Sequence, residues 1–206
     1  VEQQQLKLGI AIGGKEIDAF LLRPSGKGPF PAAVVVYYDA QSGAGLGTPL
    51  RDFGWQLAKR GFVTLSIGKP NSGVNLQDPK RIPGRGDPYF GPVGKRLGVQ
   101  PLSALAYVAS NARRYLADRD DVADKRIGIV GHSFGGKWAL LAACLDDGFA
   151  CAAWSDPGIV FDERDRRKQN PGGSVNYWDP WYLGAELGQP IRAGTKYRFR
   201  KLPSEG

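Results

Sequence analysis

The residues of this sequence best suited to chemistry are one serine and the glycines around it. Residues 131–136 read GHSFGG, which matches G-x-S-x-G, a pattern that sets a nucleophilic serine on a sharp turn. Such a serine attacks a carbonyl carbon and forms a covalent acyl intermediate. His132 is the only histidine of the chain, and it precedes Ser133 instead of following it, as a Ser-Asp-His order requires. The sequence therefore indicates a serine nucleophile without a triad histidine downstream.

The segments on either side of this motif favour a strand, a turn and a helix. Residues 126–130 form a short apolar run with β-branched side chains, typical of a buried parallel strand. Residues 137–145 are rich in helix formers. The glycines allow close packing of strand and helix, and the first helical amides face the place where negative charge would develop. The alternative is an ordinary turn in which Ser133 only caps the helix.

The rest of the chain alternates between strand and helix patterns. Strands are expected at residues 6–12, 16–23, 32–38, 62–67, 126–130 and 149–154, and helices at 50–60, 102–117 and 137–145. Gly61 is expected to be the C-terminal cap of the helix at 50–60. This alternation predicts a single α/β domain over residues 1–206, with a mainly parallel sheet and helices on both faces. Residues 39–48 read as a glycine-bearing loop and residues 68–98 as a long loop that shapes a pocket. Residues 160–206 read as an irregular aromatic and basic segment.

Several polar residues fall where the predicted strands end. Ser133, Asp39, Ser66 and Asp156 all lie near carboxyl ends of strands, where parallel sheets bind ligands. Asp156 is either an acid of the site or a turn residue before Pro157, and Asp39 has the same two interpretations. For His132 we expect local packing or hydrogen bonding beside the sheet, since neighbouring residues at a tight turn point in different directions.

Composition excludes several classes of function. The net charge of +8 is spread along the chain, which predicts a solvated surface and no nucleic-acid binding. No apolar run is long enough to span a membrane, so no membrane contact is expected. Cys144 and Cys151 do not form a metal-binding pattern and are expected in the core, with a disulfide between them as the alternative. Neither a metal nor a cofactor is predicted. The sequence begins at Val1 and contains no methionine, which fits both an exported chain without its leader and a fragment.

Three further segments carry a family resemblance. Residues 28–36, 57–63 and 124–130 resemble the entry to the third strand, the helix-to-strand step after it, and the approach to the serine turn in α/β-hydrolases. The chain is similar to the dienelactone hydrolase and acetyl xylan esterase-like branch of that superfamily over about residues 5–184. Members of the superfamily normally continue with two more strands that carry an acid and then the histidine. The resemblance therefore predicts an α/β-hydrolase fold that is incomplete at its C-terminus.

The resemblance implies a serine hydrolase acting on a small-molecule carboxylic ester through an acyl-enzyme. Ser133 would attack, Asp156 would be the acid, and the amides of Phe134 and Ala40 would form the oxyanion hole. The predicted substrate-binding residues are Asp39, Trp154, Tyr177 and Trp178. The two aromatic residues of segment 177–178 equally fit a role as cover for the sheet.

The absent histidine keeps a second interpretation open. The chain would then be a non-catalytic protein of the same fold that binds a ligand or a partner. A fold that lacks its last strands would also leave a sheet edge open, which predicts a homo-oligomer covering that edge.

Overall fold

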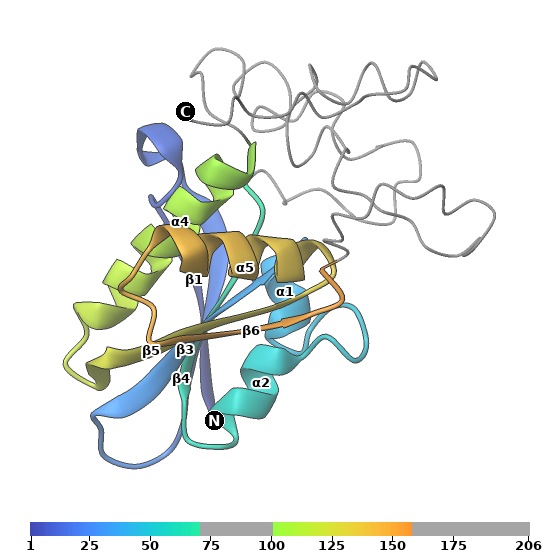
Figure 1. The fold of residues 1–206 in the computed structure, drawn as a ribbon. Helices are drawn as coiled ribbons and strands as arrows, with labels where there is room; N and C mark the ends of the chain where they lie inside the picture. The colour runs from blue at the N-terminus through green and yellow to red at the C-terminus, as the bar shows by residue number, and fades with distance from the viewer. Residues whose placement is uncertain (71–100, 158–206) are drawn as a thin grey trace, which may run out of the picture.

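The computed structural model describes residues 1–70 and 101–157, which form one six-stranded sheet covered by helices (Figure 1). The strands run in the order β1-β2-β4-β3-β5-β6 across the sheet. Their bounds are β1 Glu2–Leu8, β2 Ile17–Arg23, β3 Phe30–Tyr37, β4 Val63–Gly68, β5 Val122–His132 and β6 Cys151–Ser155. The helices are α1 Ala40–Gly43, α2 Phe53–Ala58, α4 Pro101–Ala117 and α5 Phe134–Leu145, with a 3₁₀ turn η1 at Ile12–Gly14.

The centre of the sheet is parallel and its first edge is antiparallel. Strands β4, β3, β5 and β6 pair in parallel, whereas β1 pairs antiparallel with β2 and β2 antiparallel with β4. Because the parallel strands point the same way, the carboxyl ends of β3, β4, β5 and β6 lie at one edge of the sheet. The predicted α/β class is confirmed, and the sheet is more precisely a mixed one.

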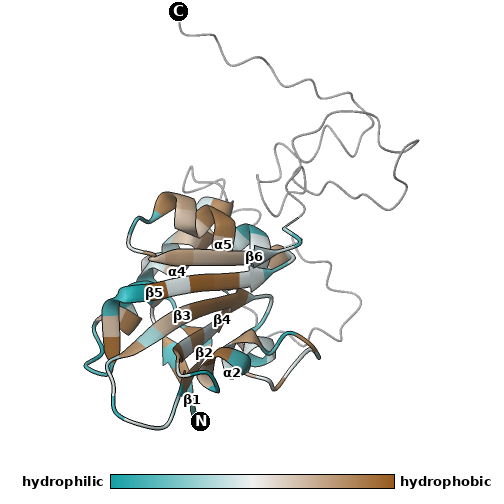
Figure 2. Ribbon diagram, turned by 60° about the horizontal axis from the view of Figure 1, so that its bottom comes forward, coloured by the Kyte–Doolittle hydropathy of each residue, from teal (hydrophilic) through white to brown (hydrophobic). Residues whose placement is uncertain are grey.

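Helices cover both faces of the sheet, as the alternation predicted. Along β2, Ala19 and Leu21 join the large apolar core that includes residues of α4 and α5. Phe20 and Leu22 point the other way and pack with Ala40 and Ala58 of α1 and α2. The period of two along the strand thus assigns α4 and α5 to one face and α1 and α2 to the other. Figure 2 shows apolar colouring along the central strands and α5.

Three predicted boundaries are wrong at the N-terminal side of the fold. The first strand covers Glu2–Leu8 instead of residues 6–12, because seven residues pair with β2 although three of them are glutamines. The segment Ile12–Gly14 forms a 3₁₀ turn, with Gly13 at φ 73°. Within the expected loop 39–48, residues Ala40–Gly43 form a helix, since the Asp39 carboxylate accepts the Ser42 amide at 2.7 Å.

The chain leaves α2 through a left-handed glycine, as expected. The helix is shorter than predicted, covering Phe53–Ala58. Gly61 has φ 90°, and its amide bonds the Ala58 carbonyl at 3.2 Å, while the Phe62 amide bonds the Leu57 carbonyl at 3.2 Å. These two bonds form a Schellman motif, whose left-handed position favours glycine. The sequence prediction of Gly61 as the C-terminal cap is confirmed.

The expectation that both cysteines are core residues is wrong. Cys144 lies near the end of α5 and Cys151 begins the edge strand β6, so both are exposed, and both are free thiols. The edge position of β6 leaves its residues uncovered, and Trp154 is 48% exposed. An oligomer covering this edge stays a prediction.

Most of the long loop at residues 68–98 and all of segment 160–206 lie outside the described residues, so the domain boundaries stay predictions. Across residues 1–70 and 101–157, helices that could cross a membrane are not found.

Replacing the central leucine of β4 tests the assignment of the core. Leu65 is fully buried, so Leu65→Ala should lower the free energy of unfolding by about 2–5 kcal/mol through lost burial and a cavity. Leu46→Ala is the matched control, because Leu46 is 61% exposed and its loss should change stability by about 0.5 kcal/mol or less. Urea denaturation measures both, and equal effects would contradict the placement of β4.

Candidate active site

Ser133 occupies a strained turn between the end of β5 and the start of α5. Its backbone angles are φ 54° and ψ −115°, and α5 begins at the next residue, Phe134. A positive φ in a residue with a side chain costs about 1–3 kcal/mol and persists only where the surroundings enforce it. Ser133 is half-buried, and the strand, turn and helix around it are those that the sequence predicted.

Glycines on both sides of Ser133 are required by close backbone contacts. A Cβ at Gly131 would collide with the carbonyl oxygen of Gly135, and a Cβ at Gly135 would collide with the carbonyl oxygen of Val36 in β3. At Gly136 a Cβ would lie 2.8 Å from the Ser155 carbonyl oxygen. The turn therefore packs closely against β3 and β6, and the three glycine positions have no room for a side chain.

Both the amide and the carbonyl of Ser133 form backbone hydrogen bonds. Its amide donates to the Ser155 carbonyl at the end of β6 over 2.9 Å, and its carbonyl accepts from the Lys137 amide over 3.1 Å. The second bond starts the helix, with Ser133 as its first flanking residue. No side-chain capping bond is made by Ser133, which leaves its hydroxyl without the capping role of an ordinary turn serine.

Of the two residues predicted for the oxyanion hole, Phe134 begins α5 and Ala40 begins α1. The Phe134 ring is buried and stacks on Tyr38, just after β3, with ring centroids 4.8 Å apart. Ala40 follows two residues later in the chain and begins α1. The Ala40 carbonyl accepts the Ser66 hydroxyl of β4 at 2.8 Å, which fixes the start of α1 at the same edge of the sheet.

Asp39 acts as the cap of α1. One carboxylate oxygen accepts the Ser42 amide at 2.7 Å and the other accepts the Ser42 hydroxyl at 3.0 Å. Of the two sequence interpretations, the turn role is therefore the one realised by these hydrogen bonds. Contact of Asp39 with a substrate stays a prediction.

The remaining predicted site residues lie at or beyond β6. Asp156 directly follows the strand, is exposed, and has φ 46°. Trp154 lies within β6 and is half-exposed. Tyr177 and Trp178 lie outside the described residues. The structure thus brings Asp156 to the same edge of the sheet as Ser133, through the pairing of β5 with β6.

The His132 side chain contacts the hydroxyl group of Ser155. Its Nδ1 lies 3.2 Å from the Ser155 hydroxyl oxygen, and its ring centroid is 6.5 Å from that of Phe53 at the start of α2. Burial lowers the pKa of His132 below its usual 6.5; the charge of Arg51 lowers it further and Asp156 acts in the opposite direction. Local hydrogen bonding of His132 is what the sequence predicted.

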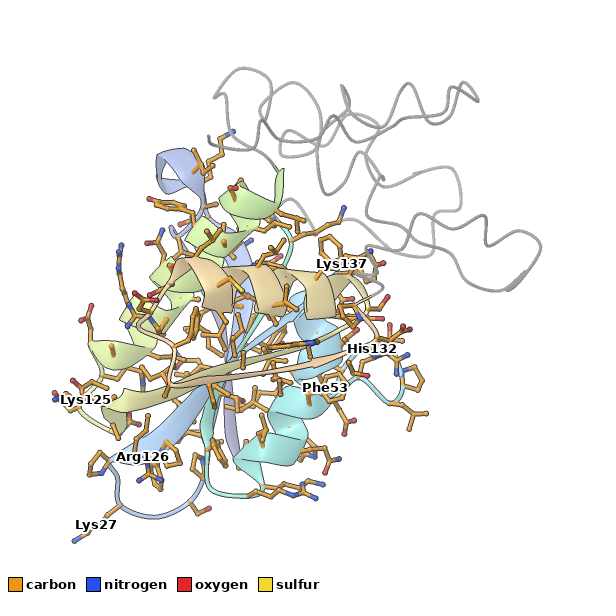
Figure 3. All side chains as sticks on the ribbon, in the orientation of Figure 1. Lys27, Phe53, Lys125, Arg126, His132 and Lys137 are labelled. Atoms are coloured by element: carbon orange, nitrogen blue, oxygen red, sulfur yellow. The ribbon has the colours of Figure 1, made fainter. Side chains whose placement is uncertain are left out.

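Ser155, Lys137 and Arg51 belong to this region, although sequence reasoning did not select them as site residues. Ser155 contacts Ser133 and His132 only because β5 and β6 pair in a register that single-sequence patterns do not show. Lys137 is a buried lysine in an apolar helix, an unusual position that could have drawn attention. Figure 3 shows His132, Phe53 and Lys137 at one end of the sheet. At the opposite end the figure labels Lys27, Lys125 and Arg126.

Among residues 1–70 and 101–157, clusters of side chains suited to holding a metal ion are not found. The described site consists of backbone amides, hydroxyl groups, one imidazole and carboxylates. This set suits nucleophilic attack on a carbonyl group with stabilisation of the oxyanion by amides.

Filling the space beside Ser133 should disrupt the turn. In Gly135→Ala the new methyl group meets backbone of β3, so we expect a loss of about 1–3 kcal/mol or more in the free energy of unfolding. Gly148→Ala is the control, since the atoms facing Gly148 belong to the end of the flexible Arg113 side chain. Urea denaturation compares the two, and a Gly135→Ala protein as stable as the control would refute the close packing.

The lowered pKa of His132 predicts a pH dependence of stability. The folded state binds the proton less readily than the unfolded state, so this contribution is present above the unfolded pKa of 6.5 and is lost as the pH falls through the lower folded value. Unfolding free energy measured from about pH 7 to about pH 5 should decline less steeply in His132→Gln than in the wild type. Identical slopes in the two proteins would show that His132 titrates as it does in the unfolded chain.

Comparison with known proteins identifies the fold. No protein-family model matches the chain. A Bradyrhizobium protein assigned as a 2-oxo-3-(5-oxofuran-2-ylidene)propanoate lactonase is 30% identical over 138 residues, which are 65% of this chain and 49% of that protein. The chain therefore spans about half the length of this curated relative.

Solved structures agree on the arrangement of the elements. A Bacteroides fragilis protein assigned as an acetyl xylan esterase matches with a TM-score of 0.59 at 15% identity, over 73% of this chain and 43% of that one. A Klebsiella pneumoniae protein assigned as a dienelactone hydrolase matches with a TM-score of 0.52 at 19% identity, over 74% and 59%. The chain has the α/β-hydrolase fold and resembles the dienelactone hydrolase and acetyl xylan esterase-like branch of that superfamily.

Proposed function

We propose that Ser133 is the nucleophile of a hydrolase that cleaves a small-molecule carboxylic ester, including a cyclic ester, through an acyl-enzyme. The observation that carries this proposal is the strained backbone of Ser133, at φ 54°, between β5 and the first turn of α5. For a serine that does not cap its helix, this strained conformation brings no stabilising hydrogen bond. For a nucleophile, the same conformation places the hydroxyl group at the edge of the sheet, where a substrate can reach it. The lactonase relative supports the ester class, because a lactone is a cyclic ester.

In the proposed reaction, the Ser133 hydroxyl oxygen adds to the carbonyl carbon and the carbonyl electron pair moves onto oxygen. The amide of Phe134, at the positive end of α5, would donate to this oxyanion, and the amide of Ala40 would donate from the start of α1. The tetrahedral species then expels the alcohol and leaves an acyl group on Ser133. Water hydrolyses this acyl-enzyme in the second half of the reaction.

The hydroxyl proton needs an acceptor, and the geometry limits which residue can serve. The chain contains a single histidine, and Nδ1 of that histidine is bonded to Ser155. Asp156 is a carboxylate at the same edge of the sheet, and in our proposal it accepts this proton and returns it to the departing alcohol. Without a histidine base, both acylation and deacylation should be slow, and natural alcohols, which leave poorly, should suffer most.

The same histidine contact favours a second candidate function. If no group activates Ser133, the chain is a non-catalytic protein of this fold that binds a small ligand at the edge of the sheet. In that case the pocket residues would persist, while acyl transfer to Ser133 would be absent.

Hydrolysis of p-nitrophenyl acetate separates the two candidates. This ester has a good leaving group, so we expect slow release of about one equivalent of p-nitrophenolate per chain, followed by a slower phase limited by deacylation. Removing triad members leaves roughly 10³–10⁴-fold catalysis over water in serine hydrolases, so the rate should exceed the background. Ser133→Ala should abolish the burst, and Ser25→Ala, at an exposed turn, should retain it. A wild-type rate equal to that of Ser133→Ala would reject the hydrolase and favour the binding protein.

A further inference from the structure

Ser155 lies against His132, Ser133 and Gly136 of the turn that presents Ser133. Its carbonyl accepts the Ser133 amide at 2.9 Å, and it pairs with His132 in the parallel ladder of β5 and β6. The same carbonyl leaves no room for a side chain at Gly136. Its hydroxyl oxygen lies 3.2 Å from Nδ1 of His132. One residue at the end of β6 therefore restrains the residues before and after the strained peptide.

We propose that His132 and Ser155 form a positioning pair that holds Ser133 in its strained conformation. The imidazole stands immediately before Ser133, and the carbonyl of Ser155 receives the Ser133 amide. Because the His132 side chain and the Ser133 amide both contact Ser155, the backbone on both sides of the peptide between residues 132 and 133 is held at the end of β6. A strained conformation persists only under such multiple restraint. This role rests on the proposed function, since it serves catalysis only if Ser133 is the nucleophile.

The surroundings of His132 keep its ring neutral. Among the described residues, Arg51 and Asp156 are the charged groups that act on the ring, and the ring of Phe53 packs near it. Burial and the Arg51 charge lower the pKa of the imidazole, which is therefore neutral at neutral pH. In the proposed pair, Nδ1 accepts a hydrogen bond from the Ser155 hydroxyl group and Nε2 carries the ring proton, which is one of the two directions open to a neutral ring. His132 is then a positioning residue and not the base for Ser133.

The only histidine of the chain gives a direct spectroscopic test. Nitrogen-15 NMR of the imidazole should show the Nε2–H tautomer in the wild type. In Ser155→Ala the Nδ1 resonance should move to that of a free acceptor, because the hydroxyl donor is lost. Ser155→Thr keeps a hydroxyl and should restore the wild-type spectrum, and Ser25→Ala should leave it unchanged.

Exchange of the Ser133 amide with solvent deuterium measures the positioning itself. We expect faster exchange in Ser155→Ala and His132→Leu, and wild-type protection in Ser155→Thr. His132→Asn should also retain protection, because its side-chain oxygen can replace Nδ1 as acceptor. The positioning pair would be overturned if the imidazole spectrum were the same in Ser155→Ala as in the wild type. It would also be overturned if the exchange rate of the Ser133 amide were unchanged in both Ser155→Ala and His132→Leu. Both readouts are independent of hydrolysis, so a chain with the pair intact but no acyl transfer would reject only the proposed function.

Discussion

The strained peptide at Ser133 is the constraint on which the rest of this site depends. A backbone at φ 54° in a serine is stable only if neighbouring elements leave no alternative. Here the neighbours are the end of β3 at Val36, the end of β6 at Ser155 and the first turn of α5. The order of the central strands is therefore part of the site, because β5 lies between β3 and β6 and the turn contacts both.

Buried hydroxyl groups of β4 hold α1 and α2 against the other face of the sheet. Ser66 and Thr64 of β4 are fully buried, and they donate to the carbonyls of Ala40 and Gly54 at 2.8 Å and 3.1 Å. Buried hydroxyls without partners would destabilise the fold, so these bonds both satisfy the sheet and fix α1 and α2 against it. In this way β4 sets the position of Ala40, the second predicted donor to an oxyanion, while β5 and α5 set that of Phe134. The Ala40 and Phe134 amides that the proposed chemistry needs thus come from two elements anchored to β4 and β5, the strands on either side of β3.

Local patterns in the sequence predicted the parts of this arrangement that local physics controls. The apolar run before Ser133, the helix formers after it and the glycines of the turn identified the strand, turn and helix, and Gly61 identified the end of α2. The sequence did not predict β1 correctly, because its glutamines do not look like a strand and only pairing with β2 makes them one. It also missed the short helix α1, whose formation depends on the Asp39 cap and on the buried contact with Ser66.

The contacts that span the strands could not be predicted from one sequence. Ser155 lies 23 residues from His132, and their contact follows from the register of β5 and β6. The exposure of Cys151 has the same origin, because an apolar strand is buried in the middle of a sheet and open at its edge. Patterns of residue type give the elements, whereas the order and register of strands decide which side chains meet.

If the turn is built for catalysis, it presents Ser133, and no other serine, for covalent attack. Treating the chain with a fluorophosphonate and locating the modified residue by mass spectrometry of its peptides tests this directly. We expect slow labelling of one residue, Ser133, with Ser155 and Ser66 unmodified. Modification of Ser155 in place of Ser133 would show that the turn does not present Ser133, as would an intact fold in which Ser133 reacts no faster than an exposed serine such as Ser25.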